Sequence, residues 1–359
     1  MSDNSDSIQN WSCPLPLPHK DKIVLGHGSG GKMTHDLIKI IFWKYFKNSL
    51  LNSGNDAAVF LLNDNKSTTG SQFAICTDSH VVSPLFFPGG DIGRLAISGT
   101  VNDLSMMGAT PYYLTAGFIL EEGFEINLLE KILASMQQAA GEAKVNIVAG
   151  DTKVVQKGKA DGLYINTTGF GVIPPGVNIS GKNAKPGDVV IVSGPIGDHG
   201  IAVLTARGEL GFETDIRSDV APLNCIISSI VEASNKIHVL RDPTRGGLGT
   251  TLNEIARQSG VCITIEEATI PVRPAVSSAC EVLGFDPLYI ANEGKFVVIV
   301  DPVDASKVLD VIHANPLGSE AQIIGEVQSK PQDRVLLKTT IGTTRIVDML
   351  AGEMLPRIC

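Results

Sequence analysis

Short apolar runs alternate along the chain with longer segments whose apolar residues recur every three or four positions. The short runs are typical of strands, and the longer segments are typical of amphipathic helices. In the first half they predict strands at 57–61, 73–77, 112–120, 145–149 and 163–173, and helices at 33–46, 92–107 and 126–143. In the second half they predict strands at 189–193, 262–265 and 296–300, helices near 219–237, 246–259 and 304–314, and further strands up to about Ile346.

The stretch between residues 174 and 188 marks a boundary between two parts of the chain. It concentrates Pro, Gly, Asn and Lys, which favour turns and connections. A length of 359 residues also exceeds one ordinary domain. We therefore predict an α+β fold with two α/β-containing domains at 22–175 and 176–346, an N-terminal extension at 1–21 and a tail at 347–359. Gly352 and Pro356 disfavour a rigid final helix, so the tail is predicted to be mobile.

Composition and charge narrow the class of protein. Hydrophobic residues make up 43% of the chain and charged residues 19%, which predicts a globular protein with substantial cores. No apolar stretch approaches the roughly 18 residues that a membrane helix needs. The formal net charge of -9 and the lack of a Lys/Arg run argue against nucleic acid as a partner. Because the start lacks the features of a secretory signal and the six cysteines form no C-x-x-C pair, we expect a cytoplasmic protein with reduced thiols.

A glycine-rich segment, Gly26–Lys32, fits two phosphate-binding motifs that belong to incompatible folds. A P-loop requires Ser or Thr after the lysine as a ligand of Mg²⁺, and Met33 stands there. A dinucleotide-binding fold requires a full strand before the glycines, and only a three-residue apolar run precedes them. We interpret the segment as a glycine loop that folds over a nucleotide phosphate, with Gly28, Gly30, Gly31 and Lys32 as its binding residues.

Five aspartates stand beside small residues in distinctive short segments, and several of them follow apolar runs. They are Asp56, Asp78, Asp103, Asp151 and Asp242. A single aspartate in such a place is most often a turn former or a helix cap. Five together favour a binding site, because oxygen ligands without His or Cys select hard cations, and Mg²⁺ is held by a few carboxylates together with nucleotide phosphates. The residues therefore predict a carboxylate-rich ATP site without a P-loop.

Taken together, these segments resemble the HypE family of hydrogenase maturation proteins from about residue 22 to the end of the chain. This family belongs with aminoimidazole ribonucleotide synthetase, selenophosphate synthetase and thiamine-phosphate kinase in the PurM-like superfamily. The resemblance rests on the segments 27–31, 77–91, 99–103, 150–155, 197–200, 241–247, 291–295 and 356–359. The aspartate segments indicate only the superfamily, whereas the terminal Pro356–Cys359 singles out HypE.

The resemblance implies a two-domain PurM-like fold that dimerises through the β-sheet of its N-terminal domain and binds ATP and Mg²⁺. By position, the metal ligands would be Asp56, Asp78, Asp103 and Asp242, and the nucleotide site would add Asn102 and Asp151. Asn55 departs from the acid that relatives often carry before the Asp-Ala-Ala, which puts one possible ligand in doubt. The first 20 residues have no counterpart in the family.

The activity implied by the resemblance is an ATP-dependent carbamoyl dehydratase. HypF would load a carbamoyl group onto Cys359, ATP would activate the carboxamide oxygen, and loss of phosphate would leave a thiocyanate. The cyanide would pass to a HypC–HypD complex for the Fe(CN)₂CO centre of a [NiFe] hydrogenase. Lys153 and Glu293 resemble the family's proton-handling pair, and the sequence does not decide which of them is the base.

Two other functions remain open at this stage. A sister-family kinase or synthetase would act on a small metabolite and would not need Cys359. A passive carrier would have its tail loaded and unloaded by other proteins. The sequence also leaves open whether K⁺ joins Mg²⁺, which hydrogenase is served, and what the first 20 residues do.

Overall fold

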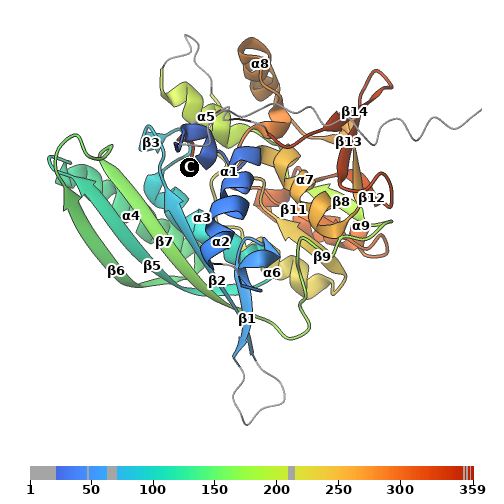
Figure 1. Cartoon of the computed structure of the whole chain (residues 1–359), viewed down its shortest axis with the longest axis horizontal. Coiled ribbons are helices and arrows are strands. Elements are labelled where there is room, and N and C mark those ends of the chain that lie inside the picture. The colour runs from blue at the N-terminus through green and yellow to red at the C-terminus, as the bar shows by residue number, and fades with distance from the viewer. Residues whose placement is uncertain are drawn as a thin grey trace, which may run out of the picture.

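The protein is described by a computed structural model over residues 22–46, 48–62, 71–208, 215–350, 352, 355 and 357–359. The predicted N-terminal extension, 1–21, lies outside the described residues. Two β-sheets, one in each half of the chain, organise the rest, and helices pack against both (Figure 1). The α+β class with two domains is confirmed, whereas the domain boundaries stay predictions.

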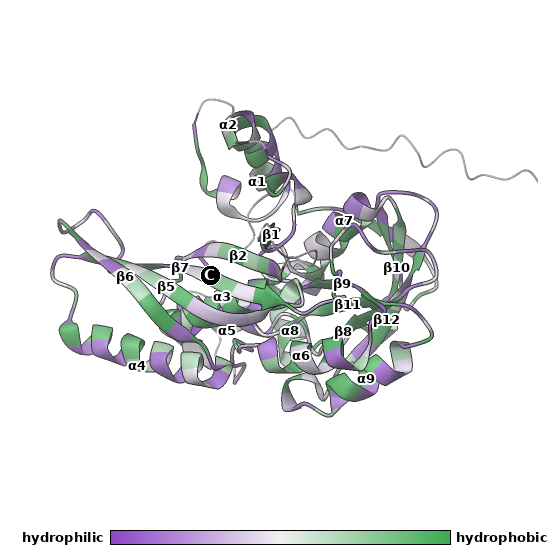
Figure 2. Cartoon of the chain, turned by 90° about the horizontal axis from the view of Figure 1, so that it is seen from below, coloured by the Kyte–Doolittle hydropathy of each residue, from purple (hydrophilic) through white to green (hydrophobic). Residues whose placement is uncertain are grey.

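The N-terminal sheet has five strands in the order β1-β2-β7-β5-β6. Neighbouring strands are antiparallel except for the parallel pair β5 and β6. The strands are β1 (Ala58–Leu62), β2 (Ser71–His80), β5 (Thr110–Glu121), β6 (Asn146–Val155) and β7 (Leu163–Ile173), and a small pair, β3 (Phe86–Phe87) and β4 (Gly90–Asp91), follows β2. Helices α3 (Ile92–Met106) and α4 (Ile126–Ala143) lie on one face of this sheet (Figure 2).

The C-terminal sheet has seven strands in the order β14-β13-β10-β12-β8-β11-β9. Its strands are β8 (Val189–Val192), β9 (Ile237–Arg241), β10 (Cys262–Glu266), β11 (Val297–Val300), β12 (Gln322–Gln328), β13 (Arg334–Lys338) and β14 (Thr344–Val347). The helices of this half are α5 (Asp198–Ala206), α6 (Asn224–Ala233), α7 (Gly247–Ser259), α8 (Pro274–Leu283) and α9 (Ala305–His313), with single 3₁₀ turns at η5 (Glu267–Thr269), η6 (Pro287–Tyr289) and η7 (Pro316–Gly318). Strands such as β11 are buried on both faces, which explains their continuous apolar sequence.

An N-terminal helical segment, which we call the arm, stands apart from both sheets (Figure 2). It comprises η2 (Leu25–Gly28), α1 (Lys32–Leu37), the π-helical turn η3 (Ile38–Phe42) and α2 (Trp43–Phe46), and the turn η4 (Leu51–Ser53) follows it. Its base is tied to the C-terminal half, because the Lys32 N–H donates to the Leu350 carbonyl at 2.9 Å and His35 meets Glu254 at 2.9 Å. Beyond that base, its apolar side chains are exposed.

Helix α3 connects the two halves and is the most deeply buried helix of the N-terminal domain. Nearly all of its side chains are buried, because the N-terminal sheet and α4 pack on it and α6 reaches it from the other half. The cluster around α3 also includes Ile358, which is 3% exposed, and the partly buried Cys359. The end of the chain therefore packs against the core of the N-terminal domain.

Several elements match their predicted positions, and others differ. The helix at 126–143 and the strand at 163–173 have the predicted bounds. Strands β2 and β6 are longer than predicted, so Asp78, Asp151 and Lys153 lie within strands instead of in loops after them. The predicted helix near 219–237 begins only at Asn224, and α5, α8 and β9 were not predicted. None of the helices described is long and apolar enough to cross a membrane.

Candidate functional site

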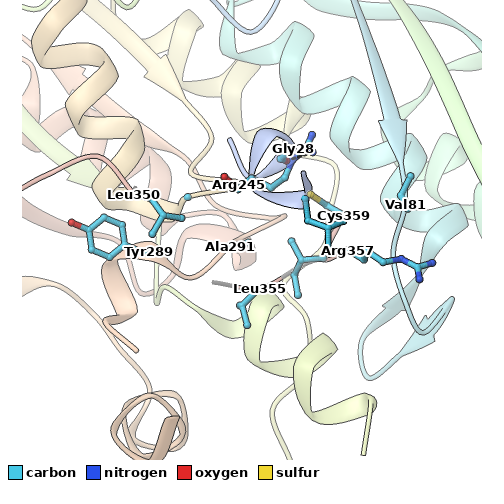
Figure 3. A pocket seen from close by; sticks show the side chains of 13 residues that line it. Gly28, Val81, Arg245, Tyr289, Ala291, Leu350, Leu355, Arg357 and Cys359 are labelled. Carbon is cyan, nitrogen blue, oxygen red and sulfur yellow. Dashed lines mark hydrogen bonds between the residues drawn. The ribbon is translucent and has the colours of Figure 1, made fainter. Parts of the chain in front are cut away.

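Cys359 lies in a cavity of about 170 Å³ between the two halves of the molecule (Figure 3). We call this cavity the tail pocket. It is lined by Gly28 from the arm, Val81 after β2, and Arg245 before α7, and Figure 3 shows Cys359 beside Arg245 and Gly28. The tail itself contributes Leu355 and the residues from Arg357 onward. The predicted reactive cysteine therefore lies where both domains and the glycine segment meet.

Main-chain hydrogen bonds hold the last residues against the segment that follows β2. The Val81 N–H donates to the main-chain oxygen of Cys359 at 3.1 Å, and the Ser83 N–H donates to the Arg357 carbonyl at 3.2 Å. Arg357 itself adopts a left-handed backbone conformation, with φ of 55°. This conformation is uncommon for a residue other than glycine. The end of the chain is thus docked by main-chain hydrogen bonds against the segment that follows β2.

Two side chains from α5 and its C-cap add further contacts to the tail. His199 Nε2 meets the Ile358 carbonyl at 2.8 Å, while its Nδ1 meets the Ser218 hydroxyl at 2.8 Å. Arg207 donates to the carbonyls of Ser83 at 2.9 Å and Arg357 at 3.0 Å. Burial lowers the pKa of His199, so the ring is neutral at pH 7. His199 therefore contacts the main chain of the tail through one ring nitrogen.

The Cys359 thiol faces both an acid and a cation in the tail pocket. Burial raises its pKa, Arg245 opposes this shift, and Glu293 adds to it through its charge and a hydrogen bond. The thiol is therefore protonated at neutral pH while the tail is docked. A thiol in that state is a poor nucleophile, so the docked position suits a cysteine that already carries its group.

Glu293 is fixed by hydrogen bonds to its main chain. Its N–H donates to Asp219 Oδ1 at 3.1 Å, and its carbonyl accepts from the Ala221 N–H and from the Asn102 amide, both at 3.4 Å. Burial first, and then the negative charges of Asp242, Asp78 and Asp219, raise the pKa of Glu293 well above its ordinary value. Its carboxyl group therefore holds a proton more tightly than an ordinary glutamate does.

Asn102 hydrogen-bonds to main-chain groups from within α3, and its predicted contact with the nucleotide stays a prediction. Its amide donates to the carbonyls of Ala221 and Glu293, and its oxygen accepts from the Leu223 N–H at 2.8 Å. The side chain is 1% exposed. Its hydrogen-bonding groups are engaged by main-chain partners, so in this arrangement it positions Glu293 and the segment 219–223.

Four of the predicted aspartates form one acidic cluster, although they come from distant parts of the chain. Burial, and then the charges of Asp242, Asp78 and Asp56, raise the pKa of Asp103 well above its ordinary value. Burial, and then the charge of Asp56, raise the pKa of Asp242 to about 8. Asp56 and Asp242 line a cavity of about 290 Å³, which we call the acidic pocket. Such mutual repulsion favours the binding of a cation.

Arg241 neutralises part of this acidic cluster. Its guanidinium pairs with Asp56, donates to the Gly54 carbonyl at 2.9 Å and lies 3.2 Å from Glu254. All of these groups are largely buried. Arg241 therefore fixes Asp56 in place through its two terminal nitrogens, while its Nε is buried without a hydrogen-bond partner.

The carboxylates of the cluster fit an Mg²⁺ ion that is shared with a nucleotide, and they do not fit a metal site built from protein ligands alone. No group of three His, Cys, Asp or Glu side chains among the described residues is close enough to hold a metal ion alone. Asp56 Oδ2 is buried without a hydrogen-bond partner, and an ion could satisfy it. Mg²⁺ usually takes only one or two carboxylates and completes its shell with water and phosphate oxygens. Which of the aspartates would ligate it stays a prediction.

Asp151 and Lys153 lie away from the acidic cluster and from Glu293. Both are 69% exposed on β6 and pair with each other at 2.9 Å. Across the sheet, Asp78 on β2 pairs with Thr167 on β7, which pairs with Ala116 on β5, which pairs with Gly150 on β6. Three strand spacings, about 14 Å, therefore separate β2 from β6. Side chains alternate along a strand, so Asp151 and Lys153 face the opposite side of the sheet from Asp78. The structure does not bring Lys153 to Glu293 within one chain.

The glycine segment forms a turn and not a strand-to-helix loop. Gly28 lines both the tail pocket and the acidic pocket, Gly30 lines the acidic pocket, and Gly31 precedes α1. A Cβ on Gly31 would collide with the Leu350 carbonyl, so this position requires glycine. Lys32 is exposed and lines neither pocket. The predicted phosphate contact of Lys32 stays a prediction.

Comparisons with known proteins fit this geometry. The chain matches the N-terminal domain of AIR synthase related proteins over residues 54–173 and their C-terminal domain over residues 185–338. It is 52% identical over 338 residues to carbamoyl dehydratase HypE of Cupriavidus necator, covering 94% of this chain and 95% of that relative. The chain belongs to the HypE family of carbamoyl dehydratases. The predicted resemblance to this family and to the PurM-like fold is confirmed.

Two solved HypE structures superpose closely on this family member. A HypE from a HypE–HypF complex matches with a TM-score of 0.82 and 52% identity, covering 88% of this chain and 99% of that chain. A HypE in complex with ATP matches with a TM-score of 0.78 and 47% identity, covering 94% of this chain and all of the other, 100%. Both matches extend over the two domains, so the family assignment does not rest on one half of the molecule.

Some residues of the site were not singled out from the sequence. Asp219 belongs to no recognisable motif, and only its contact with Glu293 identifies it. Arg241 and Arg245 stand on either side of Asp242 in the segment 241–247, where two arginines among small residues could have signalled anion binding or charge balance. Lys295 follows Glu293 closely and pairs with Asp219 at 3.3 Å.

Proposed function

We propose that this protein dehydrates an S-carboxamide on Cys359 to a thiocyanate, using ATP, and so provides the cyanide of the Fe(CN)₂CO centre of a [NiFe] hydrogenase. The observation that carries the proposal is the position of Cys359, whose thiol meets Glu293 in a pocket that shares Gly28 and Arg245 with the acidic pocket. A group on the sulfur would therefore lie between a base and the predicted nucleotide site.

The chemistry explains why the reaction needs both a base and a nucleotide site beside the sulfur. A carboxamide loses its oxygen reluctantly because oxide is a very poor leaving group. Transfer of a phosphoryl group from ATP to the carboxamide oxygen turns that oxygen into part of a phosphate. The carbon–oxygen bond then breaks, phosphate leaves, and the two N–H protons are removed to give the nitrile. Glu293 is the candidate base, because its carboxyl group meets the Cys359 sulfur and its raised pKa makes its carboxylate a stronger base than that of an ordinary glutamate.

Asp56, Asp78, Asp103 and Asp242 are the candidate residues for a magnesium–nucleotide complex. Burial, and then the charges of neighbouring carboxylates, raise the pKa values of Asp103 and Asp242, and a bound cation would relieve the repulsion. When bound, Mg²⁺ would neutralise phosphate charge and help to position the transferred group. Gly28, Gly30, Gly31 and Lys32 are the candidate residues that close over the nucleotide from the arm.

A second copy of the chain is the proposed source of Asp151 and Lys153 for each site. These side chains share the open face of the N-terminal sheet with the exposed Ile75, Tyr113 and Ile119. A homodimer formed through these faces would bury that apolar surface and bring the partner's carboxylate and ammonium to the site. The exposed apolar side chains of the arm would extend the same interface.

The order of partners follows from the state of the thiol. Docking keeps Cys359 protonated, so we place its carbamoylation outside the tail pocket, on HypF, which a related HypE binds in a solved complex. A HypC–HypD complex is the proposed acceptor of the cyanide. The tail would therefore leave the pocket before and after dehydration. Because a terminal thiol must stay reduced to be loaded, we place the reaction in the cytoplasm.

Intact-mass spectrometry of the tail tests the proposal. The protein is carbamoylated with HypF, separated from it, and incubated with Mg-ATP. We expect the loss of the mass of one water from the terminal peptide, with one ADP formed per tail. A Cys359→Ser variant serves as the control, because it should bind ATP and show no such loss. An unchanged mass in the presence of bound ATP would instead favour a passive carrier of the loaded group.

A further inference from the structure

Arg245 occupies the boundary between the two cavities of the site. It lines the tail pocket together with Cys359 and lines the acidic pocket together with Asp56 and Asp242. Of the residues that line both cavities, Arg245 is the one with a charged side chain. Figure 3 shows Arg245 beside Cys359 in the tail pocket, and the same residue also lines the acidic pocket.

The guanidinium of Arg245 has donors to spare. One nitrogen donates to the Gly28 carbonyl at 3.1 Å, and among the described residues no carboxylate lies within salt-bridge distance of it. Arg241, four residues earlier, contrasts with it because Asp56, Glu254 and the Gly54 carbonyl engage its guanidinium. An arginine carries five N–H donors in a rigid fork, and because the Arg245 side chain is exposed, its remaining donors are open to a bound ligand.

The electrostatic surroundings keep this arginine charged. The nearby Cys359 sulfur, with Asp78, Glu293 and Asp103, raises its pKa although burial opposes the shift. Its main chain is also held in place, because a Cβ on Gly30 would come within 3.0 Å of the Arg245 Cβ and 3.1 Å of its carbonyl oxygen, at a φ of 74°. The glycine segment and Arg245 therefore fit together closely, and Arg245 lines both pockets from this fixed position.

We propose that Arg245 is a catalytic residue that binds the phosphoryl group while it passes from ATP to the carboxamide oxygen on Cys359. The proposal rests on the proposed function. In this step the bond between the γ-phosphorus and the β,γ-bridging oxygen breaks, a bond from that phosphorus to the carboxamide oxygen forms, and ADP leaves. Charge spreads over the three equatorial oxygens during transfer, and a planar guanidinium binds two of them at once.

A structural role gives a different expectation. If Arg245 only fixed the glycine segment through the Gly28 carbonyl, its loss would weaken binding of the nucleotide in the ground state and binding of the phosphoryl group during transfer to the same extent. If Arg245 acts in the transfer, its loss should weaken binding of the phosphoryl group during transfer much more than binding of the nucleotide in the ground state. Comparing ADP with ADP plus aluminium fluoride, which imitates a phosphoryl group in transfer, separates the two roles without relying on turnover.

The experiment measures binding of both ligands by calorimetry to carbamoylated full-length protein. For Arg245→Ala we expect ADP affinity within about threefold of the parent protein and a loss of roughly 100-fold or more for ADP–aluminium fluoride, since such arginines contribute about 10³ to 10⁵ in rate. Arg245→Lys, which is the safer variant for folding, should show the same selectivity, because one ammonium does not replace a fork of donors. Arg345→Lys, in an exposed pair with Asp286, is the matched control and should bind both ligands normally.

Turnover supplies the second measurement. Arg245→Ala should convert its carbamoylated tail on the order of 10³-fold more slowly, and added guanidinium ion should restore part of the rate. Equal losses for ADP and ADP–aluminium fluoride, or a normal rate in both variants, would overturn the proposal. If the parent protein itself fails to convert the carboxamide, the proposed function is wrong, and the comparison of the two ligands still reports on Arg245.

Discussion

The Val81 N–H donates a hydrogen bond to the main-chain oxygen of Cys359 at 3.1 Å. Val81 follows the strand that carries Asp78, so one element of the N-terminal sheet positions both a carboxylate of the acidic cluster and the end of the chain. The hydrogen bond belongs to the main chain and does not depend on a particular side chain. The Cys359 sulfur is therefore positioned by main-chain hydrogen bonding, which is also what joins the strands of the sheet.

The first prediction concerns how tightly the tail is docked. Arg207→Ala removes the hydrogen bonds to the carbonyls of Ser83 and Arg357 and should raise the undocked fraction. We expect alkylation of Cys359 by a maleimide at fixed pH to become about fivefold faster, since a hydrogen bond contributes roughly 1 kcal/mol. Arg345→Ala should leave the alkylation rate unchanged. Equal rates in all three proteins would mean that Arg207 does not hold the tail.

The second prediction concerns the base. Glu293→Gln keeps the size of the side chain and removes its ability to accept a proton, so the carbamoyl group should persist while ATP still binds. We expect conversion to slow by about 10² to 10⁴-fold. Glu281→Gln, on the exposed side of α8, is the matched control. Normal conversion by Glu293→Gln would move the role of base to another residue.

The pH dependence of conversion provides an independent check on Glu293. Only the deprotonated carboxylate accepts a proton, and burial with neighbouring negative charge raises the pKa of Glu293. The rate should therefore rise with pH over a range well above the ordinary pKa of 4.5 for a glutamate. Single-turnover rates over a series of pH values test this. An acid limb centred near the ordinary value would contradict the assignment.

The third prediction concerns the stability of the acidic cluster. The pKa of Asp242 is about 8 in the folded protein against an ordinary 3.8, so between these values the folded state binds the proton more tightly. Its contribution to stability is complete below the ordinary value and is lost as the pH rises toward about 8. Asp242→Asn should therefore gain on the order of several kcal/mol over the parent protein near pH 8 and lose Mg-dependent ATP binding. Thermal unfolding across pH measures the gain.

The control for this prediction is Asp310→Asn, an exposed residue of α9 outside the cluster. It should follow the pH dependence of the parent protein. A parent and an Asp242→Asn variant whose stabilities fall in parallel with rising pH would show that Asp242 is not the group that titrates.

The fourth prediction concerns the second copy of the chain. Lys153→Ala and Glu293→Gln should each be inactive alone. If Lys153 serves the partner's site, mixing the two variants under conditions that exchange subunits produces mixed dimers with one intact site. We then expect about a quarter of the parent activity, since random exchange puts half of the chains in mixed dimers. No recovery in mixtures whose exchange is verified by mass would place both residues in the same chain's site or remove Lys153 from the reaction.

The sequence predicted some elements closely for identifiable reasons. Helix α4 carries a regular amphipathic pattern and ends at a left-handed Lys144, and β7 alternates buried and exposed side chains along its whole length. Such periodicity is visible without tertiary information. By contrast, the short strand β9 and the helix α5 are buried on most sides, so their apolar residues show no clear period.

The candidate site was predicted only in part, because local sequence patterns identify segments and do not show how the segments meet. The aspartates were recognised as a set by their segments, and Cys359 was recognised by the terminal motif. Their segments could not reveal that Asp78 and Asp151 face opposite sides of one sheet, because that depends on strand length and register. The roles of Asp219 and Asn102 depend on contacts between the two halves of the chain, which no local pattern records.

Isotope transfer from the carboxamide to phosphate tests the central claim most directly. Cys359 is carbamoylated with an ¹⁸O-labelled carbamoyl donor, and the isolated protein undergoes one turnover with unlabelled Mg-ATP. The account predicts that the label appears in inorganic phosphate, one labelled oxygen for each thiocyanate formed, because the carboxamide oxygen attacks phosphorus. Thiocyanate formed with unlabelled phosphate, the label having gone to water, would contradict it.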